Sequence, residues 1–295
     1  MQEFIQQVVS GLAQGGIYAS LALALVIIYS AMGLINFAQG EFAMFATFIA
    51  WTFIFQLSVP IAIAFALTVA IAFGGGILIE RAIVRPFERG PQLNVVIVTL
   101  ALFSIANGTA GLIWHYFPRP FPSPFPAHSA DIGGVFISIE NVGVIGVTVG
   151  VLLLMYLFFN LTPIGLAMRA AAVYPESSRL LGIRVGRMLG LGWGLASAVG
   201  AVSGILVAPL VFLEPNMMQT IIIYAFAAAV LGGIDSPIGA VVGAMILGVA
   251  LNLITITPFV DRLADLRTPL ALALIVVLLI VRPQGLFGHR HVVRV

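Results

Sequence analysis

The sequence predicts an all-α polytopic membrane protein with about eight or nine transmembrane or re-entrant helices. Two observations carry this prediction. Of the 295 residues, 61% are hydrophobic and only 8% are charged, with a mean hydropathy of +1.15, and apolar stretches of membrane length recur along the whole chain. A soluble protein of this size needs far fewer apolar residues to build its core. We therefore expect residues 1–295 to form a single transmembrane domain.

The candidate spans follow from length, because a helix needs ~20 apolar residues to cross the hydrocarbon layer. They lie at residues 7–30, 33–56, 60–80, 94–114, 142–160, 188–213, 217–234, 236–257 and 263–281. The last is the weakest, since Asp265 and Arg267 interrupt it. The chain opens on Met-Gln-Glu-Phe-Ile-Gln-Gln without the basic region of a cleaved signal peptide, so the first apolar segment is predicted to be retained.

Arginine placement orients the spans, since cytoplasmic loops carry an excess of basic residues. Ten of the 13 arginines fall in loops 81–93 and 161–187 and in the C-terminal tail: Arg81, Arg85, Arg89, Arg169, Arg179, Arg184, Arg187, Arg282, Arg290 and Arg294. These segments are predicted to be cytoplasmic. Loop 115–141 carries only Arg119 and a run of alternating prolines that favours extended backbone. It is predicted to face outward.

The side of the N-terminus depends on the second apolar segment. Three apolar segments precede Arg81, so the N-terminus lies outside if all three cross the membrane. If the segment around Asn36 to Glu41 is re-entrant, the N-terminus lies inside and the chain crosses eight times. Both topologies agree with the arginine pattern.

A charged island, residues 169–184, separates two membrane-length apolar stretches. Pro175 is tolerated in the first turn of a helix, so the segment can form a short helix that presents polar and apolar side chains together. We expect residues 170–183 to dock a cytosolic partner. The residues predicted to contribute are Arg169, Pro175, Glu176, Arg179, Leu180, Gly182 and Ile183.

Two interruptions of the apolar pattern share one design. Ile35-Asn-Phe-Ala-Gln-Gly40 and Ile234-Asp-Ser-Pro-Ile-Gly239 each place an amide or acid after Ile and a Gly four residues later. Asn36 and Asp235 are predicted to be N-caps of the helices that follow. Paired broken helices in two halves of a chain are typical of a transport pathway built from repeats. The alternative is that both are ordinary interhelical turns near the membrane surface.

Polar residues beside these breaks are the candidates for the pathway. They are Asn36, Gln39, Glu41, Asp235 and Ser236. A carboxylate within a span is costly and indicates function by default, which applies to Glu41 unless it lies at the level of the lipid headgroups.

Glycines recur at helical spacing between residues 182 and 204, which predicts a helix face that a neighbouring backbone approaches closely. These are Gly182, Gly186, Gly190, Gly194, Gly200 and Gly204. Gly74-Gly75-Gly76 indicates a flexible or tightly packed point in the third span.

Several chemistries are excluded by composition. The chain has no Lys and no Cys, which removes a Walker A phosphate loop, a Schiff-base lysine and a thiolate nucleophile. Its histidines, at positions 115, 128, 289 and 291, lack carboxylates at metal-ligand spacing, so no metal site is predicted. No Gly-x-Ser-x-Gly elbow is present. We predict no enzymatic activity for this chain.

Five ordered motifs resemble the permease subunits of ABC importers for branched-chain amino acids, over nearly the whole chain. They are Gly11-Leu-Ala-Gln-Gly-Gly-Ile-Tyr18, Ile35-Asn-Phe-Ala-Gln-Gly-Glu-Phe42, the island Arg169 to Ile183, Leu231-Gly-Gly-Ile-Asp-Ser-Pro-Ile-Gly-Ala240 and the tail Arg282-Pro-Gln-Gly-Leu-Phe-Gly288. Val173-Tyr174 departs from the more polar pair that this family resemblance leads us to expect before Pro175.

The resemblance implies a division of labour. Two cytosolic ATPase subunits bind ATP and Mg, a periplasmic binding protein delivers the substrate, and a second homologous permease completes the pathway. It further implies an inner-membrane location, with no cofactor in this chain.

Family resemblance leaves the cargo open. Leu, Ile and Val are favoured, and the alternative is a permease of the same family for urea, short amides or other amino acids. A stand-alone channel or ion-coupled carrier is the alternative of another class, and it would normally place a clear acid or His within a span.

Overall fold

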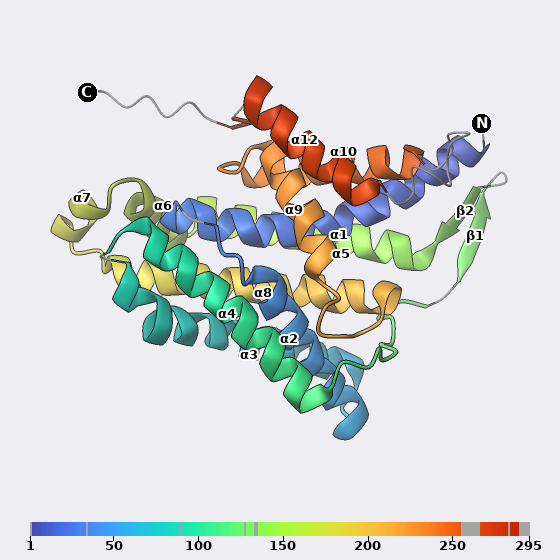
Figure 1. The fold of residues 1–295 in the computed structure, drawn as a ribbon, viewed down its shortest axis with the longest axis horizontal. Coiled ribbons are helices and arrows are strands. Elements are labelled where there is room, and N and C mark those ends of the chain that lie inside the picture. Colours follow the sequence, from blue (N-terminus) through green and yellow to red (C-terminus); the bar gives the residue numbers. More distant parts are fainter. Residues whose placement is uncertain are drawn as a thin grey trace. The chain divides into compact units, whose positions relative to one another are not determined.

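The computed structural model describes residues 2–33, 35–88, 90–126, 128–132, 135–254, 266–282 and 284–288. Helices make up most of this part of the chain, as the sequence predicts (Figure 1). Arg89, Asp265, His289, Arg290, His291 and Arg294, which entered the sequence predictions, lie outside the described residues.

The helices in chain order are α1 (Gln2–Met32), α2 (Gln39–Trp51), η1 (Thr52–Gln56), α3 (Ile61–Ile79), η2 (Glu80–Val84), η3 (Arg85–Phe87), α4 (Gln92–Trp114), α5 (Ile139–Leu161), α6 (Pro163–Val173), α7 (Pro175–Leu180), α8 (Val185–Val211), α9 (Gln219–Gly232), α10 (Pro237–Leu253) and α12 (Arg267–Val281). Each stretch predicted to cross the membrane coincides with one of these helices, the second with α2 continued by η1. Among the described residues, five helical segments are long and apolar enough to span a bilayer, and α9 with α10 form a pair bent by 118°. The chain is a polytopic membrane protein.

Loop 115–141 has one feature that the sequence did not predict. It contains an antiparallel hairpin of β1 (Ser129–Ile132) and β2 (Val135–Ser138), with Ser129 opposite Ser138. The prolines lie before the hairpin, where a missing N–H breaks no ladder hydrogen bond. The hairpin therefore lies in the Pro-free end of the loop.

The chain divides into two compact units. Unit 1 comprises residues 1–26, 125–150 and 220–295, and unit 2 comprises residues 27–124 and 151–219. Helices α1, α5 and α9 each contribute residues to both units.

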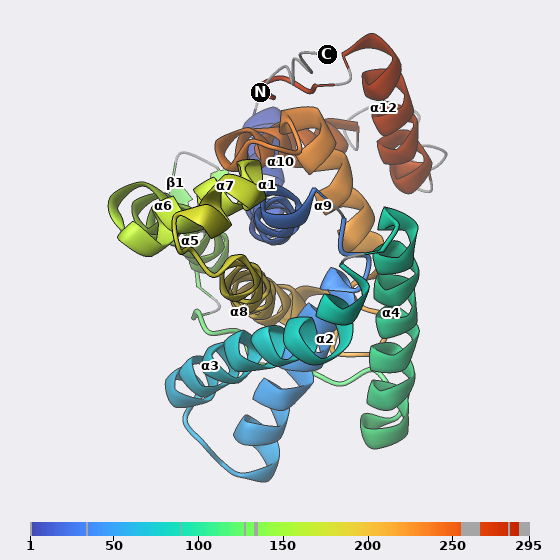
Figure 2. The same ribbon diagram turned by 90° about the vertical axis from the view of Figure 1, so that its left-hand side faces the viewer.

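Unit 2 is built around α8, which lies beside α2 and α3 (Figures 1 and 2). The predicted glycine face of α8 makes these contacts. A Cβ on Gly194 would lie 2.9 Å from the Phe73 carbonyl oxygen of α3, and a Cβ on Gly204 would lie 2.5 Å from the Ala43 carbonyl oxygen of α2. Larger residues at these two positions would push the helices apart, so the close packing predicted for this face is confirmed there.

Unit 1 packs the first part of α1 against α10. A Cβ on Gly248 would lie 2.6 Å from the Gly15 Cα, so the two backbones meet closely. The Asn252 Nδ2 donates to Gln14 Oε1 at 2.8 Å across the same contact. On α5, the Thr148 hydroxyl donates to the Gly16 carbonyl oxygen at 2.9 Å. Close packing of small residues and hydrogen bonds between helices therefore hold these helices together. This is expected in a membrane, because lipid tails are as apolar as the helix surfaces and the hydrophobic effect does not drive helices to associate.

Candidate functional site

The first break, before α2, is closed by its own side chains. Asn36 and Gln39 are 1% and 0% exposed. The Asn36 Oδ1 accepts the Ala38 N–H at 3.0 Å, which closes a local Asx-type turn. Gln39 Nε2 donates to the Ala196 carbonyl oxygen at 2.9 Å, and so joins α2 to α8.

The predicted capping role of Asn36 is wrong. Helix α2 begins at Gln39, its N-cap is Ala38, and no side chain caps it. Asn36 lies two residues too early, because its side chain turns the chain before the helix begins. Ala196 lies 11 residues after the start of the 27-residue α8, which places the break level with the middle part of that helix.

Glu41 follows in the first turn of α2 and is 1% exposed. Asn107 of α4 donates to its Oε2 through Nδ2 at 3.2 Å. In the described part of the chain no arginine or histidine forms an ion pair with this carboxylate. Glu41 is therefore a buried acid whose described side-chain partner is an amide.

The second break, between α9 and α10, is arranged differently. Ser236, not Asp235, is the N-cap of α10, and its Oγ accepts the Gly239 N–H at 3.0 Å. The predicted cap on Asp235 is therefore wrong, because Pro237 starts the helix and leaves the preceding hydroxyl in the capping position.

The C-terminal tail completes this second break. The N–H groups of Leu286 and Phe287 donate to the carbonyl oxygens of Leu231 and Gly232, at 2.9 and 2.8 Å. These carbonyls belong to the last turn of α9 and have no partner within that helix. The tail motif thus caps α9 from outside the helix.

The charged island forms two short helices instead of the single helix predicted over residues 170–183. Helix α6 ends at Val173, and α7 begins with Pro175 at its first position, as predicted. Gly182 ends α7 with φ of +82° while the Ile183 N–H donates to the Ser178 carbonyl oxygen at 2.9 Å, a Schellman-type termination. Apart from the two neighbouring residues in the chain, no atom would lie within 4 Å of a Cβ on Gly182. Its predicted packing role is wrong, since this glycine serves a turn.

Helix α7 presents an unusual surface. Leu180 is 90% exposed, and its neighbour Leu181 is 82% exposed. On the same short helix Arg179 Nη1 donates to Glu176 Oε1 at 2.8 Å, with both side chains exposed. Exposed leucines beside charged groups are typical of a protein–protein contact surface.

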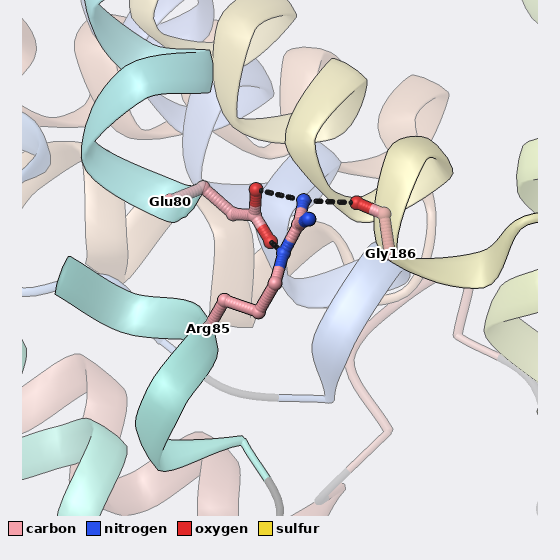
Figure 3. A network of polar contacts seen from close by, with 3 residues as sticks. All are labelled: Glu80, Arg85 and Gly186. Carbon is pink, nitrogen blue, oxygen red and sulfur yellow. Dashed lines mark hydrogen bonds and ion pairs between the residues drawn. The ribbon is translucent and has the colours of Figure 1, made fainter. Parts of the chain in front are cut away.

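A half-buried ion pair follows α3, and its arginine also contacts the start of α8 (Figure 3). Glu80 is fully buried and accepts from Arg85 Nε and Nη2 at 2.9 and 2.6 Å. Arg85 Nη2 also donates to the Gly186 carbonyl oxygen at 2.5 Å. Gly186 follows the island by two residues, so this contact lies directly beside the island.

This ion pair borders a cavity of about 990 Å³. Its charged lining comprises Arg85, Glu88, Arg179, Arg184 and Arg187. Burial, with the nearby Glu80 charge, raises the pKa of Glu88 to about 7. In the unfolded chain the pKa of this carboxyl has its ordinary value of 4.5, so the folded chain holds the proton more tightly. Glu88 therefore opposes folding increasingly as pH rises from about 4.5 to about 7.

An apolar cavity of about 410 Å³ lies between α2, α3 and α4. Among its lining residues only Thr109 and Ser197 carry polar side-chain atoms. Several of the others, including Ile71 and Ile105, are exposed, as expected of side chains that face lipid. It lacks the convergent polar groups of a ligand site.

Comparison with known proteins now identifies the chain. Residues 7–282 match the family described as branched-chain amino acid transport system / permease component. The chain belongs to this family. The permease is 31% identical to the high-affinity branched-chain amino acid transport system permease protein BraD of Pseudomonas aeruginosa, over 99% of this chain and 98% of BraD.

A second relative is the corresponding protein LivH of Escherichia coli, 28% identical over 99% of the permease and 98% of LivH. Among solved structures, PsaBC from Streptococcus pneumoniae in complex with Fab superposes with a TM-score of 0.48 at 12% identity, covering 96% of the permease and 93% of that chain. The relatives match the permease end to end, so the family resemblance inferred from the motifs is confirmed.

Three polar residues of the permease escaped the sequence predictions: Glu80, Arg85 as its partner, and Asn107. Glu80 stands at the end of an apolar run five residues before Arg85, a spacing that an ordinary α-helical turn does not bring together. The wider turn of the π-helix η2 places the two side chains side by side, and no feature of the sequence indicated that turn. Asn107 gave no signal, because its partner Glu41 is 66 residues away in the sequence.

Proposed function

We propose that the chain is the membrane-spanning permease subunit of an ABC importer that carries branched-chain amino acids across the bacterial inner membrane. The family match over residues 7–282 carries this proposal. ATP and Mg are then bound by two separate cytosolic ATPase subunits, in agreement with the absence of lysine and hence of a Walker A loop here. A periplasmic binding protein and a second homologous permease complete the importer.

The cytosolic surface is assigned to the island. Arg169, Pro175, Glu176, Arg179, Leu180, Gly182 and Ile183 are proposed to engage the ATPase. Leu180 lies exposed beside the Glu176–Arg179 pair, which supports this role. Binding of a partner would remove the apolar surface of this leucine from water. The Glu80–Arg85–Gly186 contact then links the docked island to α3.

The proposed topology is supported by the two ends of unit 2. Arginines of the first basic loop and of the island line one cavity, together with Gly33 at the end of α1. At the far ends of α4 and α8, Arg119 of the Pro-rich loop pairs by a backbone bridge with Leu213. We propose that the first end is cytoplasmic and the second periplasmic. Since α1 ends at the cytoplasmic cavity, its beginning is then outside.

The pathway is assigned to the polar residues of the breaks: Asn36, Gln39, Glu41, Asp235 and Ser236. Burial of the first three within unit 2 supports the assignment, because buried polar groups in a membrane are costly unless they serve packing or transport.

The test is ATP-driven uptake of labelled leucine, isoleucine and valine into proteoliposomes that hold the complete transporter and its binding protein. Uptake should require ATP and all subunits. Uptake of urea or acetamide in place of these amino acids would overturn the cargo assignment. Uptake by the permease alone would indicate a carrier instead.

The docking assignment has its own variant test. Glu176→Arg reverses a charge on the docking surface and should reduce the rate of leucine uptake at least about tenfold. The permease should stay folded. Gly182→Trp should do the same, because φ of +82° disfavours any side chain there. Arg169→Gln, which keeps a polar side chain on α6, serves as the milder comparison. Unchanged uptake in both stronger variants would contradict the assignment.

A further inference from the structure

Three oxygen acceptors converge on one nitrogen in unit 2. The Asn107 Nδ2 lies 3.2 Å from Glu41 Oε2, 2.9 Å from the Pro215 carbonyl oxygen and 3.2 Å from Asn216 Oδ1. An amide nitrogen carries only two hydrogens and can satisfy only two of these acceptors at once. A primary ammonium group carries three hydrogens and a positive charge, which matches three acceptors of which one is a carboxylate.

We infer that this cluster is a binding site for the ammonium group of the transported molecule, with the Asn107 amide occupying the position of that ammonium when the site is empty. Glu41 supplies the opposite charge, and Pro215 and Asn216 supply neutral acceptors. The residues come from α2, from α4 and from the segment after α8, so the site exists only in the folded unit.

Neighbouring groups hold the acceptors and the amide in place. Gln219 Nε2 donates to Asn216 Oδ1 at 3.0 Å, which fixes the orientation of that side chain. The Tyr116 hydroxyl donates to Asn107 Oδ1 at 3.0 Å. Gly111 leaves room for this tyrosine, because a Cβ there would lie 2.6 Å from the Tyr116 oxygen. Rotation of Asn107 toward Tyr116 would free the three acceptors.

The site can be reached from one side. Asn216, Gln219 and Tyr116 are exposed, whereas Glu41 is buried behind them. Asn107 lies seven residues before the end of α4 at Trp114, which is ~10 Å along the helix at 1.5 Å per residue. That end is the proposed periplasmic end, from which a binding protein would deliver its cargo. The inference rests on the proposed function only for this direction and for the choice of amino-acid probes.

The decisive variant is Glu41→Gln in the complete transporter. Glutamine keeps an oxygen that accepts the Asn107 N–H, so a purely structural contact would survive and leucine uptake would stay unchanged. Loss of the charge should instead lower uptake at least about tenfold, a full decade in rate, without lowering the melting temperature. Glu3→Gln, an exposed glutamate in the first turn of α1, is the matched control and should retain uptake.

A second measurement does not depend on transport. Leucine and leucinol, which both carry the ammonium, should raise the melting temperature of the transporter without its binding protein, whereas 4-methylpentanoate, which lacks the ammonium, should not. Both shifts should disappear in Glu41→Gln.

Equal protection by 4-methylpentanoate, or unchanged uptake by Glu41→Gln, would overturn the inference. Abolition of wild-type uptake by a protonophore at constant ATP would also overturn it, because Glu41 would then serve a proton. If wild-type protein shows the leucinol shift but transports no branched-chain amino acid, the site stands and the proposed cargo falls.

Discussion

The two breaks share a sequence pattern but are closed by different means. Before α2, buried side chains of Asn36 and Gln39 satisfy the turn and reach across to α8. Between α9 and α10, the hydroxyl of Ser236 caps one helix and the backbone of residues 286–287 caps the other. The first break thus depends on side chains at mid-helix depth, and the second depends on the tail. A shared pattern therefore predicted two interruptions but not a shared role.

Removing the tail should have the largest effect on stability. A chain ending at Arg282 leaves the Leu231 and Gly232 carbonyls without the tail N–H groups. At roughly 1–3 kcal/mol for each buried group left unsatisfied, the loss should be about 2–6 kcal/mol. Thermal unfolding in detergent measures it.

A chain ending at Gly288 keeps both hydrogen bonds and is the matched control for that truncation. Equal melting temperatures for the two truncated chains would show that the tail does not stabilise the second break.

Asn36→Leu should come next, because it removes the acceptor of the Ala38 N–H and the contact with Gln39. We expect about 1–3 kcal/mol of destabilisation from the unsatisfied buried N–H. Leucine uptake should fall in rate more than in apparent affinity if the break lines the pathway. Asn36→Asp keeps the acceptor oxygen and should preserve the turn. A stable Asn36→Leu variant would contradict the importance of this side chain.

Ser236→Ala tests the second break at its N-cap. Losing a side-chain cap typically costs ~1 kcal/mol, and Ser236→Thr should retain most of the stability because it keeps the hydroxyl. Thermal unfolding of the two variants separates the hydroxyl from other effects of the substitution. If Thr were as destabilising as Ala, the capping hydrogen bond would not be the cause.

Asp235→Ala should have the smallest effect on helix stability, because the side chain caps neither helix. The Gly239 N–H keeps its acceptor on Ser236 in this variant, so the cap of α10 survives and any loss of stability measures the other contacts of Asp235. Uptake and thermal unfolding are measured on the same variant. A loss of rate without a loss of stability would support its assignment to the pathway, and a loss of both would indicate a structural role instead.

Much of the site could be predicted where local rules suffice. Pro175 begins α7 because its ring already has a helical φ, and Glu176 and Arg179 pair because one turn separates them. The predictions of the two N-caps were wrong because a helix boundary can be placed from sequence only to within a few residues. A shift of one residue changes which side chain caps the helix. Asp235 and Ser236 differ by that one step.

The sequence by itself determined the membrane class, the positions of the long helices, the glycine contacts of α8 at Gly194 and Gly204, and the absence of lysine-dependent phosphate binding. Hydropathy, chain length and side-chain size act locally, so they can be read in order along the chain. Only the tertiary structure decided that Glu80 meets Arg85 and Gly186, that the tail caps α9, and that Glu41 shares Asn107 with Pro215 and Asn216. The physical reason is that a buried polar group must find a partner, and the partner depends on which helices come together.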